Sequence, residues 1–172
     1  MKKLIECVPN FSEGNDMHII DQITAEIKAV EGVSLIDVDP GKATNRTVVT
    51  MVGTPEEVCE AAFRAVKKAS ELIDMKKHKG AHPRFGATDV CPLVPVSNIT
   101  MEETVEYARA LAKRIGEELN IPVYCYESAA FTPERRNLAT CRAGEYEALG
   151  ERLSSEQWHP DFGPRELNEW TA

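Results

Sequence analysis

"VSLIDVDPGKATNRTVVTMVG", residues 33–53, contains two runs rich in aliphatic and β-branched residues, 33–40 and 46–53, separated by "GKATN". Runs of this kind favour strands, and a short connection with Gly and Asn favours an antiparallel hairpin. Because side chains alternate along a strand, Asp37 and Asp39 are expected on the face opposite Ile36 and Val38. The stretch therefore predicts two paired strands.

The segments on either side of this hairpin predict a strand and several helices. Residues 4–8 form an apolar run that ends at Pro9, and apolar residues then recur at helical spacing up to Gly32. Two capping boxes, 54–57 and 100–103, each precede an amphipathic pattern. Further elements are expected as strands at 89–96, where two prolines favour an edge or bulge, and at 121–128, and as a helix at about 142–153.

The resulting order, β-α-β-β-α-β-α-β-α, combines one hairpin with crossover connections. It is typical of an α+β fold in which a mixed β-sheet with a β-α-β-β-α-β core has helices packed on one face. No linker divides residues 1–172. We therefore expect a single domain with an irregular tail from about residue 155.

Composition and charge narrow the function classes. The chain has 172 residues and is 42% hydrophobic and 28% charged, which is typical of a folded soluble domain. Its net charge of −8 opposes binding to nucleic acid. Glu6 and Pro9 break the N-terminal apolar run too early for a signal peptide, and no run approaches the roughly 20 apolar residues of a membrane span. We expect a cytoplasmic protein without nucleic-acid or membrane partners.

The cysteines and the absent motifs exclude further chemistries. The five cysteines are scattered and never form a C-x-x-C pair, which predicts free thiols and no metal site. They are Cys7, Cys59, Cys91, Cys125 and Cys141. The sequence contains no nucleophile elbow, no phosphate-binding glycine loop and no H-E-x-x-H, so the corresponding reactions are disfavoured.

His82 is the histidine whose sequence context best suits chemistry. A histidine can accept and return a proton near neutral pH, and Pro83 keeps the His82 backbone extended. Flanking glycines permit close approach, Arg84 offers an anion ligand, and Asp89 offers a group to orient the imidazole. Two interpretations remain open, a catalytic loop and a polar turn, and spacing alone slightly favours the turn. By contrast, His18 and His78 are expected to be solvated, and His159 lies in the tail.

Two other loops are rich in polar groups. They contain Asn10, Ser12 and Glu13 after the first strand, and Asp37, Asp39, Asn45 and Arg46 at the hairpin. Ordinary turn chemistry explains most of these residues. If these loops and residues 79–90 gather at one end of the sheet, they form a polar cleft suited to a zwitterionic or dicarboxylate substrate.

Six motifs carry a family resemblance that covers nearly the whole chain. They are "CVPNFSEG" (7–14), "DVDPG…TNRTVVT" (37–50), "KGAHPRFGATDVCPLVP" (79–95), "YESAA" (126–130), "PERRNLATCRAGEYEAL" (133–149) and "PDFGP" (160–164). In this order they resemble the N-terminal subdomain of the glutamate formimidoyltransferase family. The resemblance implies transfer of a formimino group from N-formimino-L-glutamate to N5 of tetrahydrofolate, in histidine degradation and one-carbon metabolism.

The resemblance also implies roles for individual residues. His82, in "GAHPR", is the implied general acid/base, and the segment from Gly163 is implied to line the folate site. From residue type we add that Arg46 or Arg84 grips a substrate carboxylate, and that Asp39 or Asp89 orients His82. The expected substrate and folate ligands are Asp39, Asn45, Arg46, Arg84, Gly163, Pro164 and Trp170. Tetrahydrofolate is the implied co-substrate, and no metal is required.

Members of this family continue into a second subdomain, whereas this sequence reaches Trp170 and stops at Ala172. We therefore expect the C-terminal subdomain to be absent, and a homodimer or a separate C-terminal partner to complete the cleft. The alternative function is a non-catalytic folate-binding or partner-interaction module that retains the fold.

Overall fold

The hairpin predicted for residues 33–53 forms. The structure, a computed structural model, describes residues 2–81 and 84–171. It contains β3 (Ser34–Gly41) paired antiparallel with β4 (Arg46–Gly53). A register shift between Leu35 and Asp37 leaves Ile36 60% exposed, so the expectation that Ile36 shares a face with Val38 is wrong. The bulge adds one residue and moves Ile36 to the outer face.

The remaining strands behave as two long strands that are each interrupted by a proline. β1 (Leu4–Cys7) and β2 (Asn10–Phe11) both pair with β4, and Pro9 lies between them. β6 (Leu93–Ser97) and β5 (Thr88–Val90) pair with β1 and β2, and Pro92 separates them. Proline lacks the N–H that a continuous ladder needs, but Pro9 and Pro92 still accept bonds through their carbonyl groups.

These pairings confirm the α+β class and refine the expected mixed sheet. The sheet order is β5-β2-β4-β1-β6, with β3 on the other side of β4. Every pairing among the described strands is antiparallel. β1 and β3 run in the same direction, but β4 lies between them. The crossover connections therefore produce a split β-α-β arrangement, not adjacent parallel strands.

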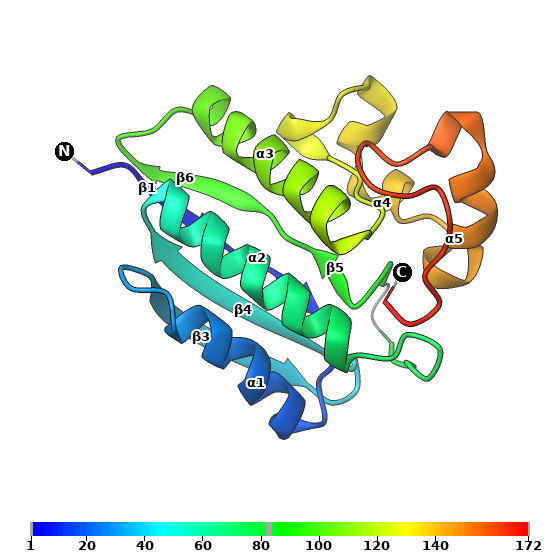
Figure 1. The fold of residues 1–172 in the computed structure, drawn as a ribbon, viewed down its shortest axis with the longest axis horizontal. Helices are drawn as coiled ribbons and strands as arrows, with labels where there is room; N and C mark the ends of the chain where they lie inside the picture. The colour runs from blue at the N-terminus through cyan, green and yellow to red at the C-terminus, as the bar shows by residue number, and fades with distance from the viewer. Residues whose placement is uncertain (1, 82–83, 172) are drawn as a thin grey trace.

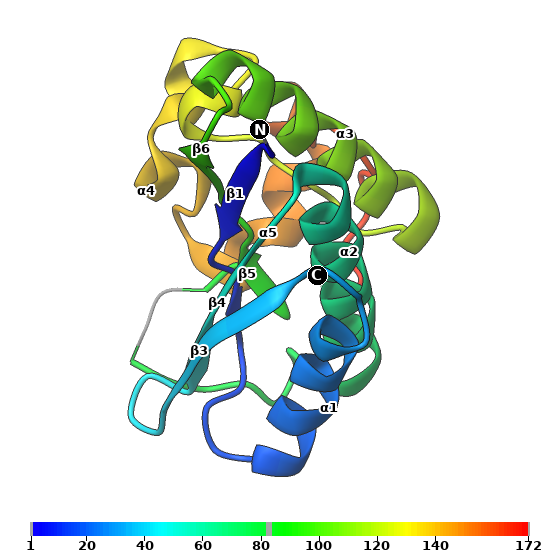
Figure 2. The ribbon, with the colours of Figure 1, turned by 90° about the vertical axis from the view of Figure 1, so that its left-hand side faces the viewer.

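Three long helices cover one face of this sheet (Figures 1 and 2). They are α1 (Met17–Lys28), α2 (Pro55–Leu72) and α3 (Met101–Leu119). Alternate strand residues, including Ile5, Val49 and Met51, are buried beneath them. The apolar stripes predicted from helical spacing therefore form the core.

The two predicted capping boxes have different outcomes. Thr100 and Glu103 form both reciprocal bonds of the box at the start of α3. Thr54 caps α2 without a side-chain hydrogen bond, so the first box is wrong. Glu57 lies against Gly32 instead, where an added Cβ would be 2.1 Å from its Oε2.

The C-terminal third adds short helices at one end of the sheet (Figure 1). They are η1 (Glu127–Ala129), η2 (Pro133–Arg136), α4 (Leu138–Cys141), α5 (Glu145–Ser154) and η3 (Glu156–Trp158). The strand expected at 121–128 is wrong, because Val123 makes only an isolated bridge to Phe162. The backbone groups of Val123 and Cys125 form hydrogen bonds with residues 161–162 instead of with the sheet.

Candidate functional site

The three polar loops identified in the sequence meet at one end of the sheet. Ser12 Oγ donates to the Gly86 carbonyl oxygen at 2.7 Å. Asn45 Oδ1 accepts from the Gly14 N–H at 2.9 Å, and Asn45 Nδ2 donates to the Lys79 carbonyl oxygen at 2.8 Å. We call residues 10–15, 41–46, 78–81 and 84–89 the loop junction. Its described residues pack closely, and the space between Asn10, Asn45, His78 and Arg84 is too small for a water molecule.

Asn45 connects all three loops through its side chain, and its backbone adopts a left-handed conformation. Its φ of 50° lies in the left-handed region, which Asn tolerates better than most residues. Its side chain also accepts from Asn15 Nδ2 at 2.9 Å. The side chain that was expected to contact substrate is therefore used within the protein.

His78 is buried in the junction, so the expectation of a solvated histidine is wrong. Its residue exposure is 8%. His78 Nε2 lies 2.7 Å from the Asn45 carbonyl oxygen, and Arg84 Nε donates to His78 Nδ1 at 3.0 Å. Both ring nitrogens are thus occupied by partners from other segments.

Arg84 is held by acidic residues of α5. Its Nη1 and Nη2 atoms donate to Glu147 at 2.9 and 2.6 Å, and Nη1 also donates to Glu145 Oε1 at 3.2 Å. These bonds, led by that to Glu147, raise the pKa of Arg84. The fork proposed for a substrate carboxylate is already engaged by two carboxylates of this chain.

Asp89 is likewise engaged within the chain. Its Oδ1 accepts from the Phe85 N–H at 2.7 Å, and its Oδ2 forms an ion pair with Arg142. His82, the expected catalytic residue, and Pro83 lie outside the described residues. The expected contact between Asp89 and His82 therefore stays a prediction.

Asp39 and Arg46 lie on the sheet face opposite the three long helices. Asp39 is exposed and its Cα is paired with Val48, while Arg46 is half-buried and paired with Gly41. Thr47, next to Arg46, is buried against the core, so Arg46 projects from the other face. Within residues 2–81 and 84–171, Arg46 forms no ion pair. Of the two arginines of the expected pair, Arg46 is thus the one without a carboxylate partner in the described part of the chain.

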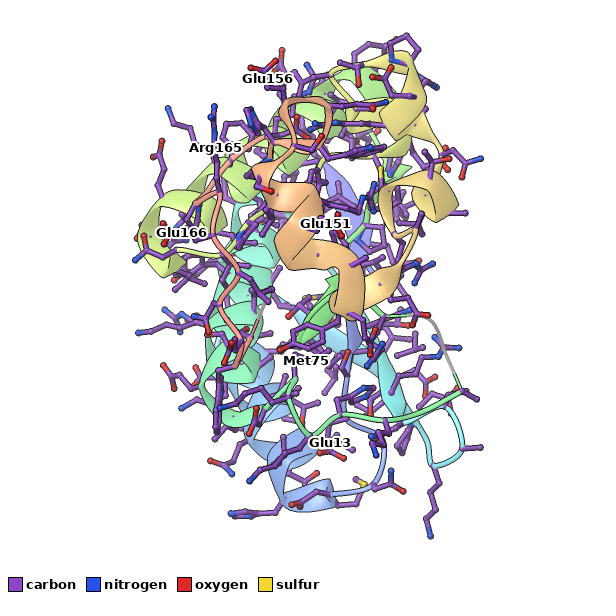
Figure 3. All side chains as sticks on the ribbon, turned by 90° about the vertical axis from the view of Figure 1, so that its right-hand side faces the viewer. Glu13, Met75, Glu151, Glu156, Arg165 and Glu166 are labelled. Atoms are coloured by element: carbon purple, nitrogen blue, oxygen red, sulfur yellow. The ribbon has the colours of Figure 1, made fainter. Side chains whose placement is uncertain are left out.

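The expected folate ligands of the tail fall into two places. Gly163 packs against Ile121, whose carbonyl oxygen would be 2.2 Å from an added Cβ, and it has a φ of 92°. Figure 3 shows the tail continuing past Arg165 and Glu166 toward Met75. There the Trp170 carbonyl accepts from the Met75 N–H at 2.7 Å. Gly163 and Pro164 thus lie at the end of α3, and Trp170 lies near the loop junction.

A separate cavity of about 330 Å³ lies between α3, the β5–β6 strands and residues 121–129. Its walls are largely apolar and include Leu111 and Val123, and it borders the loop junction at Asp89. The buried hydroxyl of Thr88 has no hydrogen-bond partner among the described residues. The volume is at the lower end of the range for small-molecule sites.

The sequence did not identify several residues of this arrangement. They are His78, Arg142, Glu145 and Glu147, which lie in the junction or hold it. The two glutamates at the start of α5 did not indicate a partner for Arg84, because acidic residues are common in the first turn of a helix without any specific partner. The free state of the five cysteines is confirmed. The described part of the chain holds no cluster of metal-ligating residues and no helix able to span a membrane.

Comparisons with known proteins agree with the motifs. A family model described as "Formiminotransferase domain, N-terminal subdomain" matches residues 4–171. The chain is 57% identical over 164 residues to a formimidoyltransferase-cyclodeaminase of Mus musculus, covering 95% of this chain and 30% of that protein. It is 49% identical over 168 residues to a glutamate formimidoyltransferase of Streptococcus pyogenes serotype M1, covering 98% and 56%. It is 48% identical over 163 residues to a glutamate formimidoyltransferase of Thermoplasma acidophilum, covering 94% of this chain and 54% of that protein. The chain thus spans about half the length of these two transferases.

Proposed function

Because the chain belongs to the formiminotransferase family and matches its N-terminal subdomain, we propose that it forms the N-terminal half of a glutamate formimidoyltransferase. The reaction moves the formimino group of N-formimino-L-glutamate to N5 of tetrahydrofolate, which is the co-substrate. One observation carries the proposal. The loop that contains the "GAHPR" motif is held against two other polar loops at one end of the sheet.

His82 acts as general acid/base in this proposal. N5 attacks the amidine-like carbon of the formimino group and forms a tetrahedral adduct. The imidazole accepts the N5 proton and then delivers it to the departing glutamate nitrogen. One histidine serves both steps because an imidazole side chain ordinarily exchanges a proton near neutral pH, and neither a metal nor a covalent nucleophile is needed.

The contacts around Arg84 favour Arg46 as the carboxylate ligand. Arg84 already donates to Glu145 and Glu147, whereas Arg46 has no ion pair among the described residues. A guanidinium binds a carboxylate through two parallel hydrogen bonds. Asp39 lies on the same sheet face, and we assign it and Arg46 to substrate binding.

A second body completes the site. The sheet face opposite the helices exposes Ile36 on β3 and Val94 and Val96 on β6, and in this proposal that face forms the interface. In this proposal the face is covered by the remaining part of a full-length transferase, either as a separate chain or in one polypeptide. A second copy of this chain could occupy the same face. The complete cleft then buries the folate-sized co-substrate.

The test is a formimino-transfer assay with a complementary half. The C-terminal part of the S. pyogenes relative, beyond the region matched here, is mixed with this chain. We expect transfer by the mixture that exceeds the transfer by either half alone. Saturable tetrahydrofolate binding without transfer would support the alternative of a non-catalytic module, and neither binding nor transfer would contradict both functions.

A further inference from the structure

The buried histidine of the loop junction has hydrogen-bond partners that allow one protonation state. The Arg84 Nε carries a hydrogen at all accessible pH values, so His78 Nδ1 must accept it. The Asn45 carbonyl can only accept, so His78 Nε2 must donate to it. The imidazole is therefore neutral, with its proton on Nε2. Because both nitrogens are occupied, this ring is not available as a second proton shuttle.

The same histidine connects the two sides of the motif loop. On one side, Asn45 bonds to Lys79, and the Ala81 N–H donates to the Ala43 carbonyl oxygen at 3.0 Å. Gly80 lies so close to this turn that an added Cβ would be 2.3 Å from the Thr44 carbonyl oxygen. Residues 79–81 are thus fixed to residues 43–45.

On the other side, Arg84 fixes the chain to α5. The Arg84 N–H donates to Glu145 Oε1 at 3.1 Å, and its carbonyl oxygen accepts from the Tyr146 N–H at 3.1 Å. The guanidinium bonds to Glu147 and to His78. Through Arg84, His78 therefore joins the residues that follow the motif histidine to those that precede it.

We propose that His78 is a positioning residue for formimino transfer, which fixes both ends of the segment that contains His82. The proposal rests on the proposed function of His82. The side chains that act with His78 are Asn45 and Arg84, and Glu145 and Glu147 hold Arg84. Such an arrangement reduces the motion of a catalytic group relative to its substrate, which affects kcat more than substrate affinity.

The first test measures the wild-type protein and needs no variant. The ¹⁵N shifts of the His78 ring are recorded by NMR. We expect one neutral tautomer with the proton on Nε2. A proton on Nδ1, or a rapidly averaging pair of tautomers, would overturn the proposal.

The second test measures amide hydrogen exchange in His78→Ala, His78→Gln and His18→Ala. We expect exchange at Ala81 and Arg84 to accelerate at least about tenfold in His78→Ala, while the core strands keep wild-type protection. His78→Gln retains one donor and one acceptor and should restore part of the protection. His18 is exposed at the start of α1, so His18→Ala should match wild type. Unchanged exchange at both amides, or an equal rise throughout the molecule, would refute the positioning role.

The third test separates this inference from the proposed function. In the complemented transfer assay, His78→Ala should lower kcat at least about tenfold with KM values within about threefold, and His78→Gln should recover part of kcat. A wild-type kcat in His78→Ala, with His82→Ala inactive, would contradict the positioning role alone. Full activity of His82→Ala would contradict the proposed role of His82, while the ring tautomer and the exchange rates would still report on the connection made by His78.

Discussion

The sheet with its three long helices and the loop junction are stabilised by different forces. The interior between the sheet and the three long helices is apolar, and residues such as Ile5, Ile27 and Met51 are completely buried there. The junction is stabilised by directed hydrogen bonds of Asn45, His78 and Arg84. Apolar packing depends on volume and tolerates many shapes, whereas a hydrogen bond depends on a donor and an acceptor at fixed positions. The core therefore sets the stability of the protein, and the junction sets the position of a few groups.

The largest difference is expected in the reactivity of the partly buried thiol of Cys59, which packs against the core. Burial raises the pKa of Cys59, on α2, to about 12. At pH 8 the native thiol should react with a disulfide reagent roughly three orders of magnitude more slowly than the same thiol in the unfolded chain. Mass spectrometry of the labelled protein with and without denaturant measures the ratio. Equal rates would show that water reaches this part of the core.

A truncation in the core should cost more stability than the loss of the Asn45 side-chain bonds in the junction. Ile27→Ala removes a fully buried side chain beneath the sheet and should lower the free energy of unfolding by about 2–5 kcal/mol. Ile27→Val, the matched control, should cost about 0.5–1.5 kcal/mol. Urea unfolding measures both values. A loss below 1 kcal/mol for the alanine variant would mean that the core is loosely packed.

In the junction, two variants of Asn45 separate hydrogen bonding from backbone strain. Asn45→Gly keeps the left-handed conformation and loses the side-chain bonds, for an expected cost of about 1–3 kcal/mol. Asn45→Ala adds the penalty of a Cβ in that conformation, about 1–2 kcal/mol more. Urea unfolding of the two variants gives the difference directly. If Asn45→Ala is as stable as Asn45→Gly, the positive φ is not required.

The smallest effect is expected for the exposed end of the junction network. The hydrogen bond from Arg84 lowers the pKa of Glu147, so this carboxylate stabilises the folded state above its unfolded pKa. That contribution is lost as the pH falls through the lowered, folded-state pKa. The Glu147 side chain is 64% exposed, so Glu147→Gln should cost less than about 1 kcal/mol at pH 7.

The difference between Glu147→Gln and wild type should disappear as the pH falls below the ordinary glutamate value of 4.5. Urea unfolding at a series of pH values measures it. Glu151→Gln, an exposed change on the same helix, is the control and should show no such trend. A difference that persists unchanged in acid would assign the effect to packing and not to charge.

The sequence predicted the elements whose signals are local. β4 forms over the predicted residues, 46–53, because β-branched residues predominate there and no proline interrupts them. The capping box at Thr100 forms because both partners belong to one turn. The strand expected at 121–128 fails because Pro122 removes a donor and the tail supplies competing partners. That competition involves residues about 40 positions away along the chain, which a local pattern does not contain.

The candidate site was predicted only in part, because most of its contacts join residues far apart along the chain. The polar cleft was predicted on the condition that the three polar loops gather, and their contacts show that these loops meet. The burial of His78 was missed because the residue lies in a lysine-rich segment that is typical of a solvated surface. Its partners, Asn45 and Arg84, are separated from each other by the length of α2. The capture of Arg84 by Glu145 and Glu147 joins positions more than 60 residues apart.

The most direct test of the account is the transfer rate of His82→Ala in the complemented assay, compared with wild type and His18→Ala. A general acid/base contributes about 10²- to 10⁴-fold to a rate. We expect a loss of that size in kcat for His82→Ala and none for His18→Ala. Equal rates for His82→Ala and wild type would contradict the assignment of formimino transfer to this loop.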